Sequence, residues 1–324
     1  MKNWSFKQWN TLLGWVVFAI AFITYLSTLE PNFSFWDCGE YISSAVKLEV
    51  THAPGAALFQ LVGAVAALFA FGNGENYSVV INSMSALFSA LTILFLFWTI
   101  THLVRRLLNK DFAEITVHQE ISILFAGVVG ALCFTFSDTF WFSAVEGEVY
   151  SMTSMFMALL VWLITKWENE YHDADNERWI ILIFFITGLS VGVHMMCMLA
   201  IPAVCLMYYA RNYEFSWKSF LWANVFTLVI LGVVFKGIFP LIMTLFGKME
   251  IFAVNGIGLP FHYGTIIAFA ILVSLCYFGI KYAKKSKKNI YQTIALSVVY
   301  MIIGFSCWMV IPIRATANPP MNLN

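Results

Sequence analysis

Long apolar runs recur along this sequence, and they restrict its fold more than any other feature. Clear runs lie near residues 12–29, 79–103, 121–137, 150–165, 219–246, 262–280 and 290–313. Each is long enough, or nearly so, to cross about 30 Å of hydrocarbon as a helix. Charged residues make up 11% of the chain, against roughly 25% in soluble domains. The sequence therefore predicts an all-α integral membrane protein in which the spanning helices are themselves the fold.

Two further apolar stretches are ambiguous. The stretch 179–210 is too long for one ordinary span, because it would make roughly 45 Å of helix. Gly188, Gly192 and His194 interrupt its middle, so we predict two short spans that turn near His194 and a bundle of about nine spans in total. The stretch 54–71 either spans the membrane or lies along its surface.

Basic residues concentrate on the cytoplasmic side of membrane proteins, and this bias ranks the possible topologies. With the N-terminus inside and 54–71 not spanning, most Lys and Arg residues fall inside, including the cluster at 281–288. A ten-span arrangement with the N-terminus outside gives nearly the same bias. The two arrangements differ in where residues 1–53 lie. Under the nine-span arrangement, residues 30–77 form a long first outer loop.

This first loop carries an acidic pair. Asp37 and Glu40 are three residues apart, and on a helix this spacing places both carboxylates on one face. Aromatic residues surround the pair, as is typical of a membrane interface. Partial desolvation there raises the basicity of a carboxylate, which then can accept a proton from an attacking hydroxyl group. We predict Asp37 and Glu40 to be catalytic and Trp36 to contact the substrate; the alternative is an ordinary polar interfacial loop.

His52 is followed by Ala-Pro-Gly, where the polar stretch gives way to the apolar segment. Pro is favourable at the first position of a helix because its missing N–H is not needed there. The residues alone therefore favour a helix-start signal with an incidental His52. The functional alternative places His52 near a phosphate or a sugar.

Further polar residues predicted to face outward are candidates for substrate binding. Glu146 and Glu148 precede an apolar run, where acids are favoured by the helix dipole, so a capping role competes with a second wall of the site. His194 is an ionisable group at or near membrane depth, which makes it a functional candidate. The full set of predicted substrate-binding residues is Trp36, His52, Glu146, Glu148, Tyr150, His194, Arg314 and Asn318.

Several classes of protein are disfavoured. Lys plus Arg equals Asp plus Glu, at 18 each, so no net positive field attracts nucleic acid. The sequence contains neither a phosphate-binding glycine loop nor a His-Glu-x-x-His zinc motif. We therefore predict no nucleic-acid partner and assign no metal ligand or cofactor; dependence on a divalent metal stays open from the sequence, and we expect membrane lipids to surround the chain.

The residues that carry these features are similar to those of a known family. Phe35-Trp-Asp-Cys-Gly-Glu40, His52-Ala-Pro-Gly55, Glu146-Gly-Glu-Val-Tyr150 and the turn from Gly188 to His194 resemble a bacterial membrane family of formerly unknown function. The animal relative of that family is a transmembrane protein O-mannosyltransferase. More broadly, the arrangement resembles the GT-C superfamily of membrane glycosyltransferases. The resemblance covers essentially the whole chain.

The resemblance implies a fold and an activity. It implies a GT-C-like bundle with juxtamembrane helices in the first outer loop, so that 54–71 does not span. The donor would be a polyprenyl-phosphate sugar, plausibly mannose, and the acceptor a Ser or Thr hydroxyl of a translocated protein, or a glycan. Asp37 would be the general base of an inverting transfer, Glu40 would position it or the acceptor, and His52, His194 and Arg314 would hold the phosphate. The site would lie on the periplasmic face of a bacterial cytoplasmic membrane.

The resemblance also bears on domain organisation. We expect residues 1–313 to form the transmembrane domain and residues 314–324 to begin an outer C-terminal segment. Family members usually continue into a soluble outer domain, so we expect this chain to be a short or truncated member. Two other functions remain open from the sequence. One is a transporter or flippase of lipid-linked intermediates, and the other is a structural membrane subunit in which Asp37 and Glu40 are dispensable.

Overall fold

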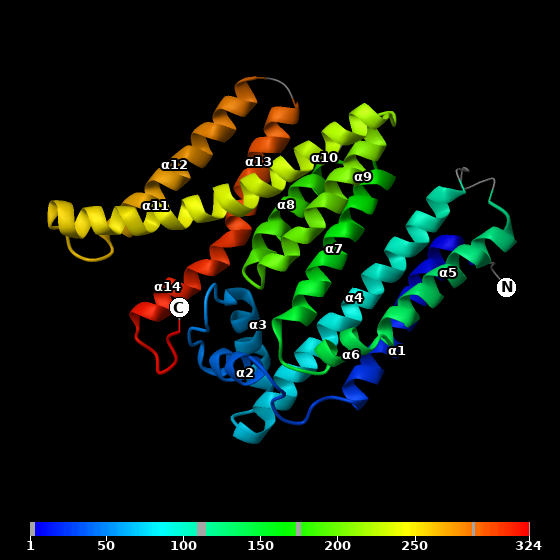
Figure 1. The fold of residues 1–324 in the computed structure, drawn as a ribbon, viewed down its shortest axis with the longest axis horizontal. Coiled ribbons are helices and arrows are strands. Elements are labelled where there is room, and N and C mark those ends of the chain that lie inside the picture. The colour runs from blue at the N-terminus through cyan, green and yellow to red at the C-terminus, as the bar shows by residue number, and fades with distance from the viewer. Residues whose placement is uncertain (1–3, 109–114, 173–175, 287–288, 324) are drawn as a thin grey trace.

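The structure, a computed structural model, describes residues 4–108, 115–172, 176–286 and 289–323, and the regular elements among them are helices. The chain runs back and forth through a bundle, with a short hairpin at one end (Figure 1). The α-helices are α1 (Phe6–Ser27), α2 (Cys38–Lys47), α3 (Ala57–Ala67), α4 (Tyr77–Leu107), α5 (Val117–Thr135), α6 (Asp138–Ala144), α7 (Val149–Asn169), α8 (Glu177–Val191), α9 (Ile201–Asn212), α10 (Trp217–Gly232), α11 (Phe239–Ile251), α12 (Tyr263–Lys285), α13 (Asn289–Phe305) and α14 (Val310–Thr316). Short 3₁₀ segments are η1 (Leu68–Ala70), η2 (Gly74–Asn76), η4 (Met195–Ala200) and η7 (Ser306–Met309), and π-helical segments are η5 (Val233–Ile238) and η6 (Phe252–Gly256).

The membrane-spanning prediction is confirmed. Among the described residues, eight helical stretches are long and apolar enough to cross a membrane. The ninth predicted span corresponds to α8, which has 15 residues. The stretch 179–210 is divided as predicted, because α8 ends at Val191 and η4 begins at Met195. The chain is therefore an all-α integral membrane protein.

Gly188 has a different role from the one its position suggested. It lies inside α8 rather than in the break, and α8 packs closely against α13 at this point. A Cβ atom on Gly188 would lie 2.0 Å from the carbonyl oxygen of Met301, and one on Gly304 would lie 2.3 Å from that of Phe185. Both glycines are thus needed for the close approach of the two backbones, and the turn itself is at residues 192–194.

The segment 54–71 forms a helix too short to cross the membrane. Helix α3 and η1 together run from Ala57 to Ala70, which corresponds to about 21 Å of helix against about 30 Å of hydrocarbon. Helix α3 pairs with α2 in a hairpin at one end of the bundle (Figure 1). Tyr41, Ile42 and Phe59 are buried in a core shared with α4 and α7. This packing fixes the acidic loop to the bundle.

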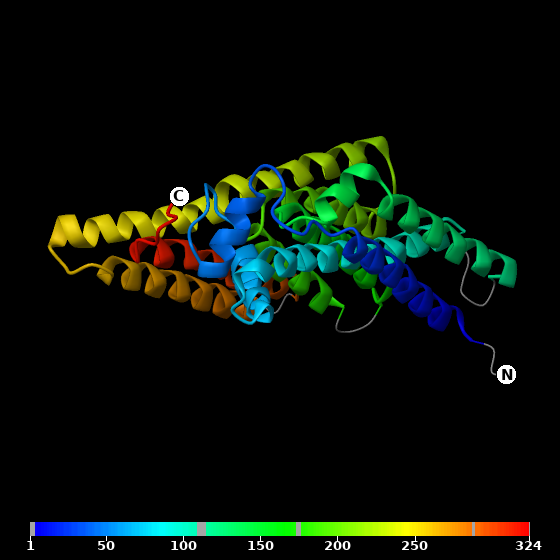
Figure 2. The same cartoon turned by 90° about the horizontal axis from the view of Figure 1, so that it is seen from below.

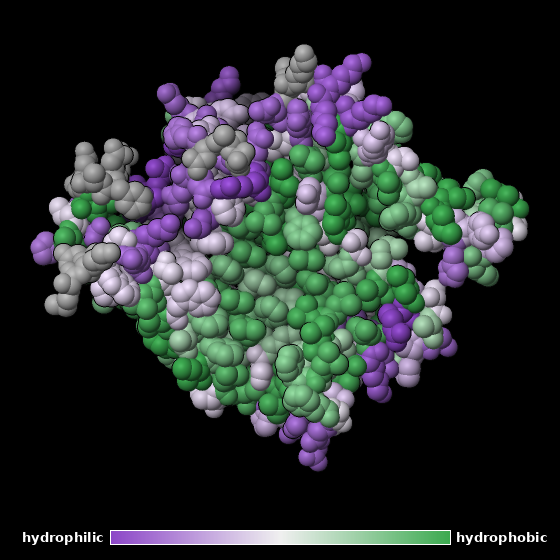
Figure 3. Space-filling view, turned by 180° about the vertical axis from the view of Figure 1, so that it is seen from behind, coloured by the Kyte–Doolittle hydropathy of each residue, from purple (hydrophilic) through white to green (hydrophobic). Residues whose placement is uncertain are grey.

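Helices α4 and α7 of the N-terminal half are the most buried of the candidate spans, with 56% of the most apolar window buried in each, against 11–28% for the candidate spans of the C-terminal half. Helices α10 and α11 join through η5 and continue into η6 as one stretch of 40 residues, Trp217–Gly256. In the most apolar window of this stretch, 22% of the residues are buried. That stretch runs along one side of the molecule, with its distal part pairing with α12 (Figure 2). A broad apolar surface covers the molecule when it is seen from behind, and hydrophilic residues gather at the end where α9 meets α10 (Figure 3).

The two ends of the bundle differ in composition. Side chains of α4, α7, α8 and α9 form a polar network at one end, where Arg106 pairs with Glu168 and Arg178 pairs with Glu170. The α2–α3 hairpin lies at the other end, because α4 begins beside it and ends in this network. Lys287 and Lys288 of the predicted basic cluster lie outside the described residues.

Candidate active site

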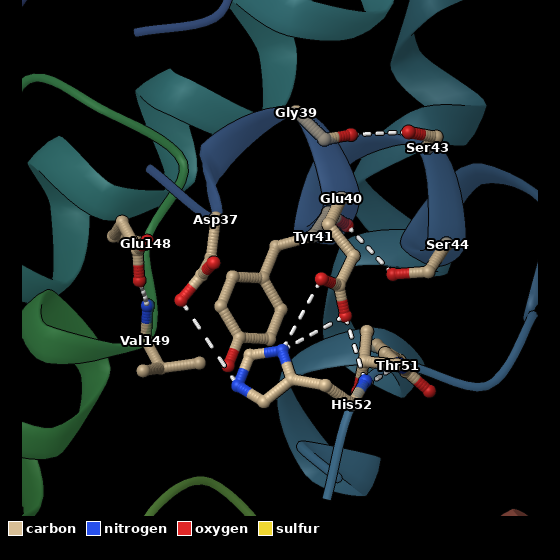
Figure 4. A network of polar contacts seen from close by, with 11 residues as sticks. Asp37, Gly39, Glu40, Tyr41, Ser43, Ser44, Thr51, His52, Glu148 and Val149 are labelled. Carbon is tan, nitrogen blue, oxygen red and sulfur yellow. Dashed lines mark hydrogen bonds and ion pairs between the residues drawn. The ribbon is translucent and has the colours of Figure 1, made fainter. Parts of the chain in front are cut away.

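The acidic pair lies at the start of α2, as the spacing predicted. The Asp37 carbonyl oxygen accepts the first helical hydrogen bond, from the Tyr41 N–H at 2.9 Å, and Glu40 lies in the first turn. The Asp37 side chain is 55% exposed and that of Glu40 is 20% exposed. The carboxylates therefore lie on one face of α2, with Asp37 the more accessible of the two (Figure 4).

The hydrogen bonds of the Glu40 carboxylate go to His52 and not to Asp37. It accepts a hydrogen bond from the His52 backbone N–H at 2.7 Å, and its two oxygens lie 3.0 and 3.2 Å from the ring Nδ1. The other ring nitrogen, Nε2, lies 4.0 Å from Asp37 Oδ2. A histidine whose Nδ1 is fixed by a carboxylate presents Nε2 in a defined orientation. The row Glu40–His52–Asp37, which we call the acid–histidine cluster, is the central feature of the site (Figure 4).

The turn that carries His52 is anchored from several sides. Helix α2 ends at Leu48, whose φ of 50° is left-handed, a common way to terminate a helix. The buried Gln60 amide donates to the Thr51 hydroxyl at 3.1 Å. Helix α3 is tied to the α8–η4 turn by a 2.7 Å hydrogen bond from the Leu58 N–H to the Gly192 carbonyl. Pro54 precedes the first residue of α3 by three positions, so it lies in the turn and not at the helix start.

The C-terminal segment also supports this turn. Arg314 donates from Nε to the Leu48 carbonyl at 2.6 Å and from a terminal nitrogen to the Lys47 carbonyl at 3.3 Å. Val50 pairs with Asn322 through a bridge, and both figures of the whole chain show the C-terminal segment beside the hairpin (Figures 1 and 2). Asn318 lies in the exposed turn after α14, and its backbone N–H donates a hydrogen bond to the Ala315 carbonyl. Among the described residues, the hydrogen bonds of Arg314 and Asn318 lead to backbone atoms outside the acid–histidine cluster.

Glu148 and two neighbouring rings form a second side of the site. Glu148 caps α7 by accepting from the Val149 N–H at 3.1 Å, so the capping role is real, yet the carboxylate also points towards Asp37 (Figure 4). Burial, together with the negative charge of Asp37, raises the pKa of Glu148 to about 7. The Tyr150 and His194 rings lie 5.8 Å apart. Burial and the nearby His52 lower the pKa of His194.

Glu146 and Trp36 lie differently from the rest of the predicted set. Glu146 is 5% exposed, one of its oxygens has no hydrogen-bond partner among the described residues, and burial raises its pKa. Its electrostatic neighbours are Ser34 and Glu30, on the chain entering the loop. Trp36 is 90% exposed and has a φ of 59°, an uncommon conformation for a bulky residue. Strained backbone conformations of this kind concentrate at functional sites, and Trp36 lies directly beside Asp37.

Tyr41 belongs to the site although the sequence reasoning did not select it. Its ring lies 5.8 Å from that of His52 and 5.5 Å from that of Phe59. Burial, reinforced by the surrounding carboxylates, raises its pKa, so the phenol stays protonated. A signal was present, because Tyr41 follows Glu40 and lies one helical turn after Asp37.

The acid–histidine cluster also has the composition of a cation site. Asp37, Glu40 and His52 each offer one ligand atom, and these atoms lie within 4.8 Å of one another. Two carboxylates and an imidazole suit a divalent ion such as zinc or manganese. Glu40 bonds to the Nδ1 side of the His52 ring, so Nε2, which faces Asp37, is the ring nitrogen left free for such an ion.

The helices and the cluster together define a multi-pass α-helical membrane protein with a polar site at one end of its bundle. The family model for the protein O-mannosyl-transferase TMEM260 N-terminal domain matches residues 37–217. This match covers more than half of the chain and includes the acidic pair, His52, Glu148 and His194. The chain belongs to this family, which confirms the predicted relation to the animal O-mannosyltransferase.

Two curated relatives carry the same name. The chain is 24% identical over 229 residues to the protein O-mannosyl-transferase tmem260 of Dictyostelium discoideum, which covers 67% of this chain and 26% of the relative. It is 29% identical over 176 residues to TMEM260 of Mus musculus, which covers 54% of this chain and 22% of the relative. The chain thus spans about a quarter of the length of these relatives. No solved structure matches it significantly.

Proposed function

We propose that this chain is a membrane glycosyltransferase. It moves a sugar, which we propose to be mannose, from a polyprenyl-phosphate donor to a Ser or Thr hydroxyl of a protein. The observation that carries the proposal is the accessible Asp37 carboxylate, 4.0 Å from a histidine that Glu40 holds in place. The names of the two relatives support the activity. A transporter would place its polar residues near the middle of the membrane, whereas this cluster lies at one end of the bundle.

The chemistry follows from the exposed carboxylate. The acceptor hydroxyl attacks the anomeric carbon, the bond from that carbon to the phosphate oxygen breaks, and the phosphate leaves with the electron pair. Asp37 takes the hydroxyl proton as general base. One carboxylate suffices for a direct displacement with inversion, because no covalent intermediate has to form.

The remaining residues position the reactants. We propose that Glu40 acts through His52, since its hydrogen bonds go to that residue. His52 and the nearby His194 would donate hydrogen bonds to the oxygens of the leaving phosphate. Glu148, with its pKa near 7, would be partly protonated and would donate to a sugar hydroxyl or a phosphate oxygen. Arg314 is engaged by two backbone carbonyls, so we assign it a supporting role.

We place the site on the outer face of the membrane, the periplasmic face if the chain is bacterial. Arg105, Arg106 and Arg178 lie at the opposite end of the bundle, and basic residues favour the cytoplasmic side. We expect an engineered cysteine at the exposed position 47, Lys47→Cys, to react with a membrane-impermeant thiol reagent added from outside intact cells. Labelling restricted to inside-out vesicles would contradict this orientation.

The substitution Asp37→Asn tests the enzymatic assignment. Loss of a general base lowers a rate by about 100-fold to 10,000-fold, so we expect at least the lower figure in transfer from labelled polyprenyl-phosphate mannose to a peptide. The matched control is Asp138→Asn, which removes an exposed carboxylate at the start of α6. The control should retain the wild-type rate. A wild-type rate in folded Asp37→Asn protein would remove the proposed base and favour a non-catalytic membrane subunit.

A further inference from the structure

A large cavity lies between the helices, away from the acid–histidine cluster. Its volume is about 980 Å³, and its walls come from α7, α8, α9, α10 and α13. Ligand sites typically have volumes of about 300–1,000 Å³. The cavity reaches Tyr171, Asn212 and Ser219 at the basic end of the bundle and Met301 in the last third of α13. It therefore extends to the end of the bundle opposite the candidate active site.

One face of α10 lines the cavity along its length. The lining positions are Ser219, Trp222, Ala223, Phe226, Thr227, Ile230 and Val234, which repeat every three or four residues as one helical face does. From Ser219 to Val234 this face extends about 22 Å. The cavity is thus long enough to take an extended hydrocarbon chain, and its interior is formed mainly by apolar side chains.

The end of the cavity near the start of α10, which we call its mouth, carries hydroxyl, amide and carboxylate groups. Tyr171 donates to the Asn212 side chain at 2.8 Å, and the Tyr209 and Ser219 hydroxyls lie 2.7 Å apart. Glu177, in the first turn of α8, also lines the mouth. The Arg211 guanidinium lies outside the lining, 4.4 Å from the centroid of the Tyr171 ring, and one of its terminal nitrogens is 3.2 Å from His172 Nε2. Hydroxyl and amide groups and one carboxylate thus stand at the polar end of an apolar cavity, with a cation behind the Tyr171 ring.

We propose that this cavity binds one zwitterionic phospholipid, with an acyl chain along α10 and the headgroup at the mouth. The phosphate would accept hydrogen bonds from the hydroxyl and amide groups at the mouth, with the positive charge of Arg211 close behind the Tyr171 ring, and the ammonium group would face Glu177. The apolar interior buries the chain, which stabilises binding in proportion to the area removed from water or from other lipid. This lipid fills the gap between α9, α10 and α13.

The chain-binding half of the proposal is tested by blocking the cavity. Thr227 is 4% exposed and lines the cavity, whereas Val229 on the same helix is 54% exposed and does not. The two side chains have nearly the same size, so Thr227→Trp and Val229→Trp form a matched pair. After purification in detergent with added phosphatidylethanolamine, native mass spectrometry should show one retained lipid in the wild type and in Val229→Trp. Thr227→Trp should lose it.

A second variant guards against misfolding. Ala223→Phe enters the same cavity with less added bulk, and thermal unfolding in detergent shows whether each variant is folded. Equal retention of lipid by folded Ala223→Phe or Thr227→Trp and by Val229→Trp would overturn the proposal. So would a wild-type protein that holds no lipid beyond that of Thr227→Trp.

The headgroup half is tested by charge. We expect Arg211→Gln, which removes the positive charge behind the Tyr171 ring, to weaken retention of phosphatidylethanolamine severalfold. Phosphatidylglycerol lacks the ammonium group, so the wild type should retain it less well, and Glu177→Gln should remove that preference. Equal retention of the two lipids by the wild type would overturn the zwitterionic assignment.

Discussion

The part of the chain that the structure describes contains two histidine–glutamate side-chain pairs, one at each end of the bundle, and their surroundings differ. At the basic end, His102 Nε2 lies 2.5 Å from Glu168 Oε2, and the two side chains are 6% and 9% exposed. Arg106 takes the second Glu168 oxygen at 2.6 Å, and Asn169 lies 3.2 Å from His102 Nδ1. At the hairpin end, the His52 and Glu40 side chains are 43% and 20% exposed, and Nε2 faces Asp37 at 4.0 Å.

The comparison teaches that the free positions around a pair, rather than the residue types, indicate its role. In the buried pair, both ring nitrogens and both carboxylate oxygens have partners, so its groups join α4 to α7 and have no site left for a ligand. In the open pair, Nε2 and the Asp37 carboxylate remain accessible to a substrate. We expect changes in the first pair to affect stability and changes in the second to affect activity.

The largest expected effect is on stability at the basic end. Glu168→Ala leaves the buried His102 and the Arg106 guanidinium without their shared acceptor, and removal of one partner of a buried ion pair costs about 3–5 kcal/mol. We expect a large fall in the thermal unfolding midpoint in detergent. The control, Glu170→Ala, removes a more exposed carboxylate that accepts from Arg178 and from the Trp179 indole N–H and should cost only about 1–2 kcal/mol. Equal midpoints for the two variants would break the comparison.

The second largest expected effect is a loss of transfer activity when the pair at the hairpin end is changed. Glu40→Gln removes the charge that orients His52, and loss of a hydrogen bond to a charged group costs about 1.5–3 kcal/mol. This corresponds to roughly a tenfold to hundredfold fall in the transfer rate, with the unfolding midpoint nearly unchanged. The exposed Glu75→Gln, near the same end, is the control and should transfer at the wild-type rate. A stability loss in Glu40→Gln as large as that of Glu168→Ala would show that the open pair is structural.

The smallest expected effect is the pH dependence that Glu148 contributes. Its pKa is raised in the folded protein from 4.5 to about 7, so between these values the folded state binds more protons than the unfolded state. The contribution of this group to stability is therefore fully present below about pH 4.5 and is lost as the pH rises through about 7. The unfolding midpoint of the wild type should fall by on the order of a few degrees over that range. Glu148→Gln should lack this component, and identical pH profiles would contradict the raised pKa.

Much of the fold was predictable from local sequence, because the length of an apolar run is set by the thickness of the bilayer. The division of 179–210 was predicted from length and from Gly188, Gly192 and His194, and the structure confirms the division while placing Gly188 inside α8. The close contact of Gly188 with Met301 was not predictable, since it depends on where α13 crosses α8. A glycine in an apolar run has the same local signature whether it breaks a helix or admits a neighbouring backbone.

The candidate site shows the same limit. Asp37 and Glu40 were found from their spacing and their aromatic surroundings, and the family resemblance drew attention to His52. The partner of Glu40 could not be identified, because a turn of the chain, rather than helical spacing, brings His52 onto α2. Arg314 was expected to bind phosphate, yet the geometry gives it the carbonyl groups of Lys47 and Leu48, more than 260 positions earlier in the chain.

The sequence by itself determined that this chain crosses a membrane repeatedly and that an acidic, aromatic loop lies at its surface. Both follow from composition over short windows, on which hydrocarbon and interface act directly. The tertiary structure decided which histidine Glu40 holds, which arginine supports the hairpin and where a cavity opens between α9, α10 and α13. These outcomes depend on how whole helices cross, because side chains from distant segments meet only after the backbones that carry them have packed.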